Sequence, residues 1–223
     1  MDVQLKLSTQ DDAHIIKNLW PLYQHEVSEF DGQRPNAHGL FGVDDSVTTL
    51  AEHGESQNAW WTDPKSLFPY LILADGHPAG FNLIAARSRL PEEFDVDFVV
   101  YEFFVLHAFR GHGVAERAAL DGFARHPGKW EIVTYPSQAR AISFWRKVVK
   151  QAVGMGSAGM GSSETGSHAA GTPGTDGTAT GGFGAGSAET GTASMEAAVS
   201  GAMERVGDHP WGRKVIFTFD NSR

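Results

Sequence analysis

One continuous stretch, from Tyr101 to Leu120, constrains this chain more than any other. It begins as an apolar run, breaks at Arg110-Gly111-His112-Gly113-Val114-Ala115 and continues with a helical pattern through Leu120. Amide groups at the start of a helix point outwards with partial positive charge, and glycine lets a backbone approach a ligand closely. The stretch therefore predicts a strand, a glycine turn and a helix start that together cradle a pyrophosphate, with Arg110 adding a positive fork.

The spacing of the glycines excludes two common phosphate-binding loops. No Gly-Lys-Ser or Gly-Lys-Thr ends the turn, so a triphosphate with Mg²⁺ is not expected, and Gly-x-Gly-x-x-Gly is also absent. The pattern Arg110-x-x-Gly113-x-Ala115 at a strand-to-helix junction instead resembles the coenzyme A loop of the Gcn5-related N-acetyltransferase (GNAT) superfamily.

A second segment carries the same resemblance. Lys129 to Tyr135 is typical of a strand, and Gln138 to Val149 is typical of an amphipathic helix. The pair resembles the superfamily's strand followed by Asn-x-x-Ala-x-x-Phe-Tyr, with Gln138 at the Asn position and Trp145 at the Tyr position.

The remaining patterns fit the same architecture. The resemblance implies an α/β (α+β) GNAT fold, in which helices flank a central mixed, mostly antiparallel sheet. Capping residues Ser8 to Asp12 precede a predicted first helix, and Asp75-Gly76 is typical of a hairpin turn. The other expected elements are a strand at 3–7, the first helix through about Phe30, a short helix at 46–53, a hairpin over 68–85 and a closing strand at 213–219.

A low-complexity segment interrupts this pattern. From Gly154 to Thr192 the chain is almost entirely Gly, Ser, Thr and Ala, which cannot bury a core. We expect a GNAT domain made of residues 1–150 plus 208–223, and a mostly disordered Gly-rich insertion at 151–207, before the last strand. Within it, Ser194 to Val206 is compatible with a helix or a weak strand.

Composition narrows the setting. The 223 residues include no cysteine, no long apolar run and no export signal, so a cytoplasmic protein without a membrane partner is expected. The formal charge of -9 disfavours a nucleic-acid surface. His107 and His112 lack a third ligand at a metal-site spacing, so we expect no metal.

The resemblance implies an acetyltransferase that moves an acetyl group from acetyl-CoA, its co-substrate, to an amine of a small molecule by direct attack in a ternary complex. A homodimer is plausible on the same ground. Residues expected to hold coenzyme A are the backbone of Phe104, Val105 and Leu106, the cradle residues Arg110, Gly111, His112, Gly113, Val114 and Ala115, and Gln138.

An ammonium acceptor must lose a proton before it attacks, so a positioned base is useful. Glu102 is the candidate, because a carboxylate on an apolar strand tends towards a raised pKa. Alternatively, Glu102 faces an edge or pairs with Arg87 or Arg89.

Acceptor contacts are expected on the first helix. Tyr23, Glu26 and Glu29 are the candidates there, although the two glutamates are also compatible with a solvated helix face.

Trp145 takes the place of the tyrosine that often reprotonates the leaving thiolate in this superfamily. An indole N–H is not a useful acid, so Tyr135, Tyr101 or water would supply the proton instead. Trp145 would then only line the thioester pocket. The same replacement keeps two further hypotheses open: a catalytically silent acyl-CoA-binding sensor or docking module, and a transferase for protein or peptide amines.

Overall fold

A single eight-stranded sheet organises the chain, in the order β1-β2-β3-β4-β5-β8-β7-β6. The structure is a computed structural model that describes residues 1–92, 94–157, 196–199 and 201–222. Neighbouring strands are antiparallel except for the parallel pair β4 and β5. The strands are β1 (Val3–Leu7), β2 (Leu67–Ala74), β3 (His77–Ala86), β4 (Phe98–Val105), β5 (Lys129–Thr134), β6 (Glu196–Val199), β7 (Ala202–His209) and β8 (Gly212–Asp220).

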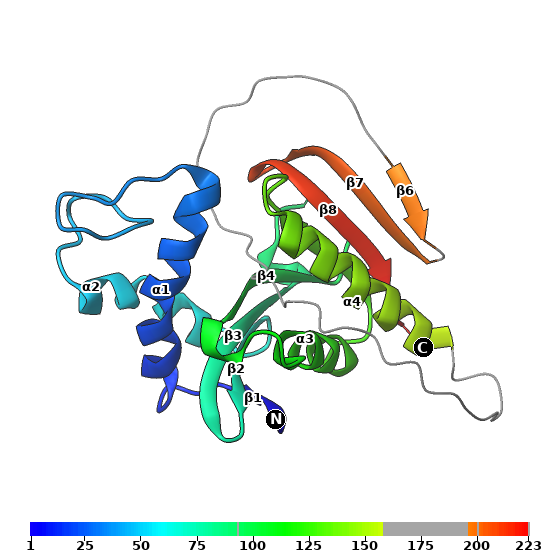
Figure 1. Ribbon diagram of the computed structural model, residues 1–223, viewed down its shortest axis with the longest axis horizontal. Helices are drawn as coiled ribbons and strands as arrows, with labels where there is room; N and C mark the ends of the chain where they lie inside the picture. The colour runs from blue at the N-terminus through cyan, green and yellow to red at the C-terminus, as the bar shows by residue number, and fades with distance from the viewer. Residues whose placement is uncertain (93, 158–195, 200, 223) are drawn as a thin grey trace.

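Helices cover both faces of this sheet (Figure 1). Helices α3 (Val114–Arg125) and α4 (Ala139–Ser157) pack their apolar sides against one face of the sheet. The core between them includes Phe103, Phe123 and Trp130. Helix α1 (Ala13–Asp31) packs on the other face in a second core, and α2 (Leu50–Glu55) lies against α1. No helix in the described part of the chain is long and apolar enough to cross a membrane.

Several predicted elements are confirmed. The hairpin of β2 and β3 turns at Asp75 and Gly76, whose φ angles of 50° and 79° match a two-residue turn with positive φ at both positions. The short second helix begins at Leu50, four residues later than expected, because Thr49 and Glu52 form a reciprocal capping box that fixes its start.

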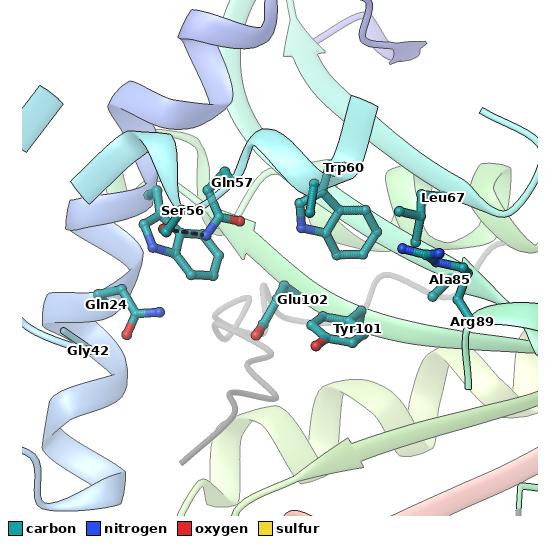
Figure 2. Close-up of a pocket in the computed structure, with 12 residues that line it drawn as sticks. Gln24, Gly42, Ser56, Gln57, Trp60, Leu67, Ala85, Arg89, Tyr101 and Glu102 are labelled. Atoms are coloured by element: carbon teal, nitrogen blue, oxygen red, sulfur yellow. Dashed lines mark hydrogen bonds between the residues drawn. The ribbon is translucent and has the colours of Figure 1, made fainter. Parts of the chain in front are cut away.

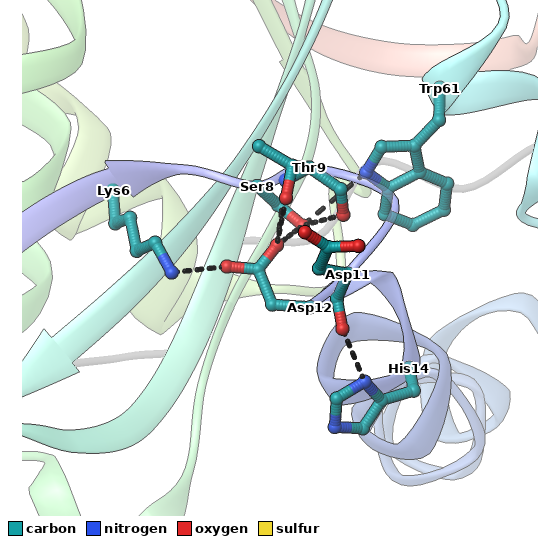
Figure 3. A network of polar contacts seen from close by, with 7 residues as sticks. All are labelled: Lys6, Ser8, Thr9, Asp11, Asp12, His14 and Trp61. Carbon is teal, nitrogen blue, oxygen red and sulfur yellow. Dashed lines mark hydrogen bonds and ion pairs between the residues drawn. The ribbon is translucent and has the colours of Figure 1, made fainter.

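The start of α1 is fixed differently from our expectation. Asp12 occupies the capping position, but its carboxylate makes no cap bond to the helix and instead accepts hydrogen bonds from the Ser8 hydroxyl (2.9 Å) and the Thr9 amide (2.6 Å) (Figure 3). Lys6 pairs with the same carboxylate, and the Trp61 indole donates to Ser8 Oγ at 3.3 Å. These contacts tie the end of β1 to the segment before β2, so the polar residues fix the turn rather than the helix amides.

Regular structure also enters both ends of the expected insertion. Helix α4 continues to Ser157, and β6 and β7 occupy parts of 196–209, with β7 paired along the length of β8. Three strands rather than one therefore follow the low-complexity segment. The predicted disorder falls mainly on residues 158–195, which lie outside the described residues.

Strands β4 and β5 separate near the middle of the sheet. Their parallel pairing covers Phe98 to Val100 of β4, although β4 continues to Val105 and β5 to Thr134. The register of β4 against β3 shifts beside this point, which places Tyr101 in a bulge before Glu102. A bulge bends and twists a strand, so the last part of β4 has an open edge on the β5 side among the described residues.

Candidate functional site

A cavity of about 400 Å³ lies on the α1 face of the sheet, beside the bulge in β4 (Figure 2). Its volume is in the range of small-molecule sites. It is lined by Trp20, Gln24, Gly42, Ser56, Gln57, Ala59, Trp60, Leu67, Ala85, Arg89, Tyr101 and Glu102.

Glu102 is the acidic side chain of this lining and is only 2% exposed. The Tyr23 hydroxyl of α1 donates a hydrogen bond to its carboxylate. The alternative ion pair with Arg87 is not what the structure has, because the Arg87 guanidinium donates to the carbonyls of Pro91 and Glu92, both at 2.9 Å. Glu102 is therefore an inward-facing carboxylate at the cavity wall.

Tyr23 differs from its expected role as an acceptor contact. Its side chain is fully buried, and its ring packs between those of Trp20, Phe81 and Phe104. Burial and the neighbouring Glu102 charge raise the pKa of the Tyr23 hydroxyl well above its usual value. The hydroxyl therefore stays protonated and positions the Glu102 carboxylate.

Lys214 is a functional candidate that the sequence did not reveal. It is 1% exposed on β8, and its ammonium lies 3.2 Å from the centroid of the Tyr135 ring. Burial lowers its pKa to about 8, partly opposed by the charges of Glu102 and Asp31. A buried lysine of this kind holds its charge only because of these acidic and aromatic neighbours.

Tyr135 follows the last residue of β5, where β5 has parted from β4. Burial, together with the Asp31 and Glu102 charges, raises the pKa of its hydroxyl. The pKa of the Tyr101 hydroxyl is also raised, mainly by burial and to a smaller extent by the charge of Glu102. Both phenols are proton donors rather than bases at neutral pH.

The predicted glycine cradle has the expected backbone. Gly111 and Gly113 adopt φ angles of 79° and 72°, and helix α3 begins immediately afterwards at Val114. His112 lies in this turn with Nδ1 2.8 Å from the Arg110 carbonyl oxygen, and Ala115 is buried in the first turn of α3. Arg117 also reaches the turn, donating to the His112 carbonyl at 2.9 Å, and adds a cation that sequence reasoning missed.

Arg110 does not point a fork at this cradle. Its guanidinium makes a two-pronged ion pair with Glu26 at 2.7 and 2.8 Å, and its Nε donates to the Val105 carbonyl at 2.7 Å. Two charged groups that are largely buried satisfy each other first, so Arg110 and Glu26 connect the end of β4 to α1. The structure therefore differs from both expectations: Arg110 does not extend a positive fork towards the glycine turn, and Glu26 does not lie on a solvated helix face.

The open edge of β4 changes which backbone groups can meet a ligand. The Leu106 amide donates to the Ala79 carbonyl at 2.8 Å, so Leu106 and Phe104 turn their polar groups towards β3. Backbone groups alternate along a strand, and Val105 and Phe103 consequently face the β5 side. Of the expected backbone positions, Val105 faces the β5 side, where its carbonyl already accepts from Arg110, and Phe103 is a position on this side that sequence reasoning missed.

Glu29 lies apart from Glu102. With Glu26, it lines a second hollow of about 660 Å³ between α1 and the segment from Phe104 to Ala108. The three expected acceptor contacts on α1 are therefore not brought together in one cavity.

Gln138 and Trp145 are both buried within the fold. The Gln138 side-chain oxygen accepts hydrogen bonds from the Thr134 hydroxyl and the Tyr135 amide, which fixes the turn from β5 to α4. Trp145 packs edge-on against Phe103 and Phe144 in the core beneath α3 and α4. Its catalytic assignment and its expected place in the pocket wall are not supported by this packing.

The part of the chain that the structure describes holds no group of three or more His, Cys, Asp or Glu side chains placed to bind a metal.

Comparison with solved structures gives similar chains that are enzymes. Aminoglycoside acetyltransferase AAC(6')-Ib in complex with coenzyme A superposes with a TM-score of 0.52 at 16% identity, covering 98% of this chain and 95% of that one. The same enzyme with coenzyme A and kanamycin gives 0.51 at 16% identity, with coverage of 98% and 95%. Its complex with ribostamycin and coenzyme A gives 0.52 at 16% identity, with coverage of 99% and 94%.

No family model matches the chain, and no curated protein matches its sequence. The structural matches confirm the expected fold.

Proposed function

We propose that this chain, which has the GNAT fold, is an N-acetyltransferase that moves an acetyl group from acetyl-CoA to an amine of a small molecule. The observation that carries the proposal is the position of Glu102, a buried carboxylate that lines a small-molecule cavity directly beside the opening between β4 and β5. The glycine turn before α3 lies at the far end of β4, so one strand connects a phosphate cradle with a base.

The residues of the cradle fit a pyrophosphate. Gly111 and Gly113 have left-handed backbone angles that side chains rarely adopt, and α3 is a 12-residue helix whose first turn follows them. An added Cβ at Gly113 would lie no closer than 3.8 Å to Arg117. Gly111, Gly113, Val114 and Ala115 would therefore hold the pyrophosphate, with Arg117 in place of Arg110 as the nearby cation.

Acetyl-CoA supplies a thioester carbonyl, which the acceptor amine attacks directly. Glu102 takes a proton from the acceptor ammonium, and the new N–C bond forms as the C–S bond breaks. Tyr135, which its raised pKa keeps protonated, donates a hydrogen bond to the leaving sulfur, and the thiolate takes up the second proton that the nitrogen loses as the amide forms. Tyr23 holds the Glu102 carboxylate in place throughout.

Coenzyme A affinity tests the cradle. Gly113→Asp places a negative charge where the pyrophosphate would lie, and we expect its affinity for coenzyme A, measured by isothermal titration calorimetry, to fall at least about 100-fold. Gly113→Asn is the matched control, because it has the same shape without the charge, and Asn and Asp both tolerate positive φ. Equal affinity in the two variants would overturn the cradle.

Release of free thiol from acetyl-CoA tests the transfer. The purified chain is assayed against polyamines, aminoglycosides, amino acids and a basic peptide. Release that depends on a small amine supports the proposal. Release with the basic peptide alone would make the acceptor a protein amine, and tight coenzyme A binding without any release would make the chain a silent binding module.

A further inference from the structure

We infer that the acceptor is a zwitterion: a small amine that also carries a carboxylate, joined by an apolar or aromatic body. This inference rests on the proposed acetyl transfer and names its acceptor class. It comes from the opposite charges at two ends of the Glu102 cavity and from the rings between them.

One end of the cavity is built to accept hydrogen bonds. Glu102 presents a carboxylate there, and Gln57 adds its side-chain carbonyl oxygen. Gln57 is 6% exposed, and while its amide nitrogen donates to Ser56 Oγ at 3.0 Å, Oε1 has no hydrogen-bond partner among the described residues. A buried acceptor without a donor is unusual, and an ammonium group, which carries only donors, satisfies both Gln57 and Glu102.

The other end carries a cation. Arg89 lines the cavity and is exposed at its mouth, and its guanidinium makes no hydrogen bond or ion pair with any residue that the structure describes. The guanidinium of Arg87, two residues earlier, instead donates hydrogen bonds to the carbonyls of Pro91 and Glu92 in the loop that follows it. A guanidinium fork matches a carboxylate in geometry and charge, so Arg89 is available for a carboxylate of the ligand.

Aromatic rings lie between the two ends. Trp60 and Tyr101 meet edge to face with ring centroids 5.2 Å apart, and Figure 2 shows both between Glu102 and Arg89. Trp20 also lines the cavity. Rings of this kind bury an apolar or aromatic body, and the amine and carboxylate of the acceptor would therefore lie at opposite ends of that body.

The same charges argue against a polycation. Among the described lining residues, Glu102 is the acidic side chain and Arg89 the basic one, so the lining has no net charge. A sugar that carries several ammonium groups would meet one carboxylate and be repelled by the guanidinium. The amine-bearing antibiotics bound by the structurally similar enzymes are consequently not the expected acceptors of this chain.

The test compares two acceptors that differ only in their carboxylate, 4-(aminomethyl)benzoate and 4-(aminomethyl)benzamide, in which an aromatic ring separates the amine from the second group. We measure kcat/KM for each with the full chain and with Arg89→Gln, and take the ratio of acid to amide. Intrinsic amine reactivity cancels between the two proteins, and we expect the ratio to fall at least tenfold in Arg89→Gln. Lys150→Gln is the control, because Lys150 is exposed on α4 and its loss removes the same charge from the opposite face of the sheet.

An unchanged ratio in Arg89→Gln would overturn the inference, as would transfer to kanamycin in preference to both aminomethyl compounds. A second readout separates this failure from failure of the acetyl transfer. 4-(Aminomethyl)benzoate is titrated calorimetrically into the chain saturated with coenzyme A. Binding that Arg89→Gln weakens tenfold supports the zwitterion site even when no acetyl group is moved, and binding that is equal in the two proteins contradicts it.

Discussion

The hydroxyl of Tyr23 on α1 donates a hydrogen bond to the carboxylate of Glu102 on β4, across 79 residues of sequence. Both side chains are buried, so this bond ties the helix over the sheet to the strand that forms the cavity wall. It also means that the Glu102 carboxylate has a fixed direction, which a base needs if it is to meet one proton of a bound acceptor.

Replacing Tyr23 with phenylalanine tests this tie. A hydrogen bond to a charged group contributes about 1.5–3 kcal/mol, so we expect Tyr23→Phe to lower the free energy of unfolding by that amount, measured by urea denaturation. Thr134→Val is the control, since the buried Thr134 hydroxyl donates to the uncharged Gln138 side chain and a neutral bond contributes about 0.5–1.5 kcal/mol. An equal loss in the two variants would contradict a charged partner for Tyr23.

Lys214 predicts a pH dependence of stability. Its folded pKa of about 8 lies below the ordinary value of 10.5, so between these values the unfolded chain binds more protons than the folded one. Stability therefore rises with pH across this window. Relative to Lys214→Met, the wild type should gain on the order of 2 kcal/mol between pH 7 and pH 9.5, measured by urea denaturation.

Lys150→Met is the control for that series, because Lys150 is exposed and the substitution removes the same charge and leaves the same new side chain at the surface. A wild type that gains no more than Lys214→Met over this pH range would show that Lys214 titrates as it does in water.

The Glu26 and Arg110 pair predicts a measurable coupling. The two side chains are 18% and 13% exposed and meet through two bonds, so a double-mutant cycle with Glu26→Gln and Arg110→Gln should give about 1–3 kcal/mol. The exposed pair Arg125 and Asp121, at 2.9 Å, should give about 0.3–0.5 kcal/mol in a parallel cycle. Similar couplings for the two pairs would refute a structural role for Arg110.

Gly80 of β3 lies against the backbone of β4, and we expect a side chain at this position to disrupt the packing of the two strands. A Cβ at Gly80 would collide with the Phe104 carbonyl oxygen, so Gly80→Ala must push β3 away from β4 and should cost about 1–3 kcal/mol. Gly154 lies in α4 with no neighbouring described atom within 4 Å of an added Cβ, so Gly154→Ala should stabilise the chain by up to about 1 kcal/mol. Thermal unfolding of the two variants measures both effects, and a Gly80→Ala protein as stable as the wild type would contradict the close approach.

Local signals accounted for the glycine turn before α3 and for much of the fold. Gly111 and Gly113 predict a turn because only their own backbone angles are involved, and Asp75-Gly76 predicts a hairpin for the same reason. Glu102 was found because a carboxylate between apolar residues of a strand is conspicuous without reference to any distant residue.

Long-range pairing decided the rest. Lys214 is buried because β8 lies beside β5, which brings its ammonium over Tyr135, and nothing near it in the sequence reports that neighbour. Arg110 was assigned to the cradle from its position in the motif, but the folded chain brings it Glu26 from 84 residues away. β7 is rich in polar residues and was not expected to be a definite strand, because its regularity comes from pairing with β8.

The most direct measurement is the rate of thiol release by Glu102→Gln, taken with the acceptor that the wild type uses best. Removal of a general base typically costs 100- to 10,000-fold in rate, and the same variant should keep wild-type affinity for coenzyme A, since Glu102 lines the cavity beside α1 and is not part of the glycine turn before α3. A large fall in kcat/KM with unchanged coenzyme A affinity is the predicted result. A Glu102→Gln enzyme as fast as the wild type would contradict the account, because the cavity would then hold no base.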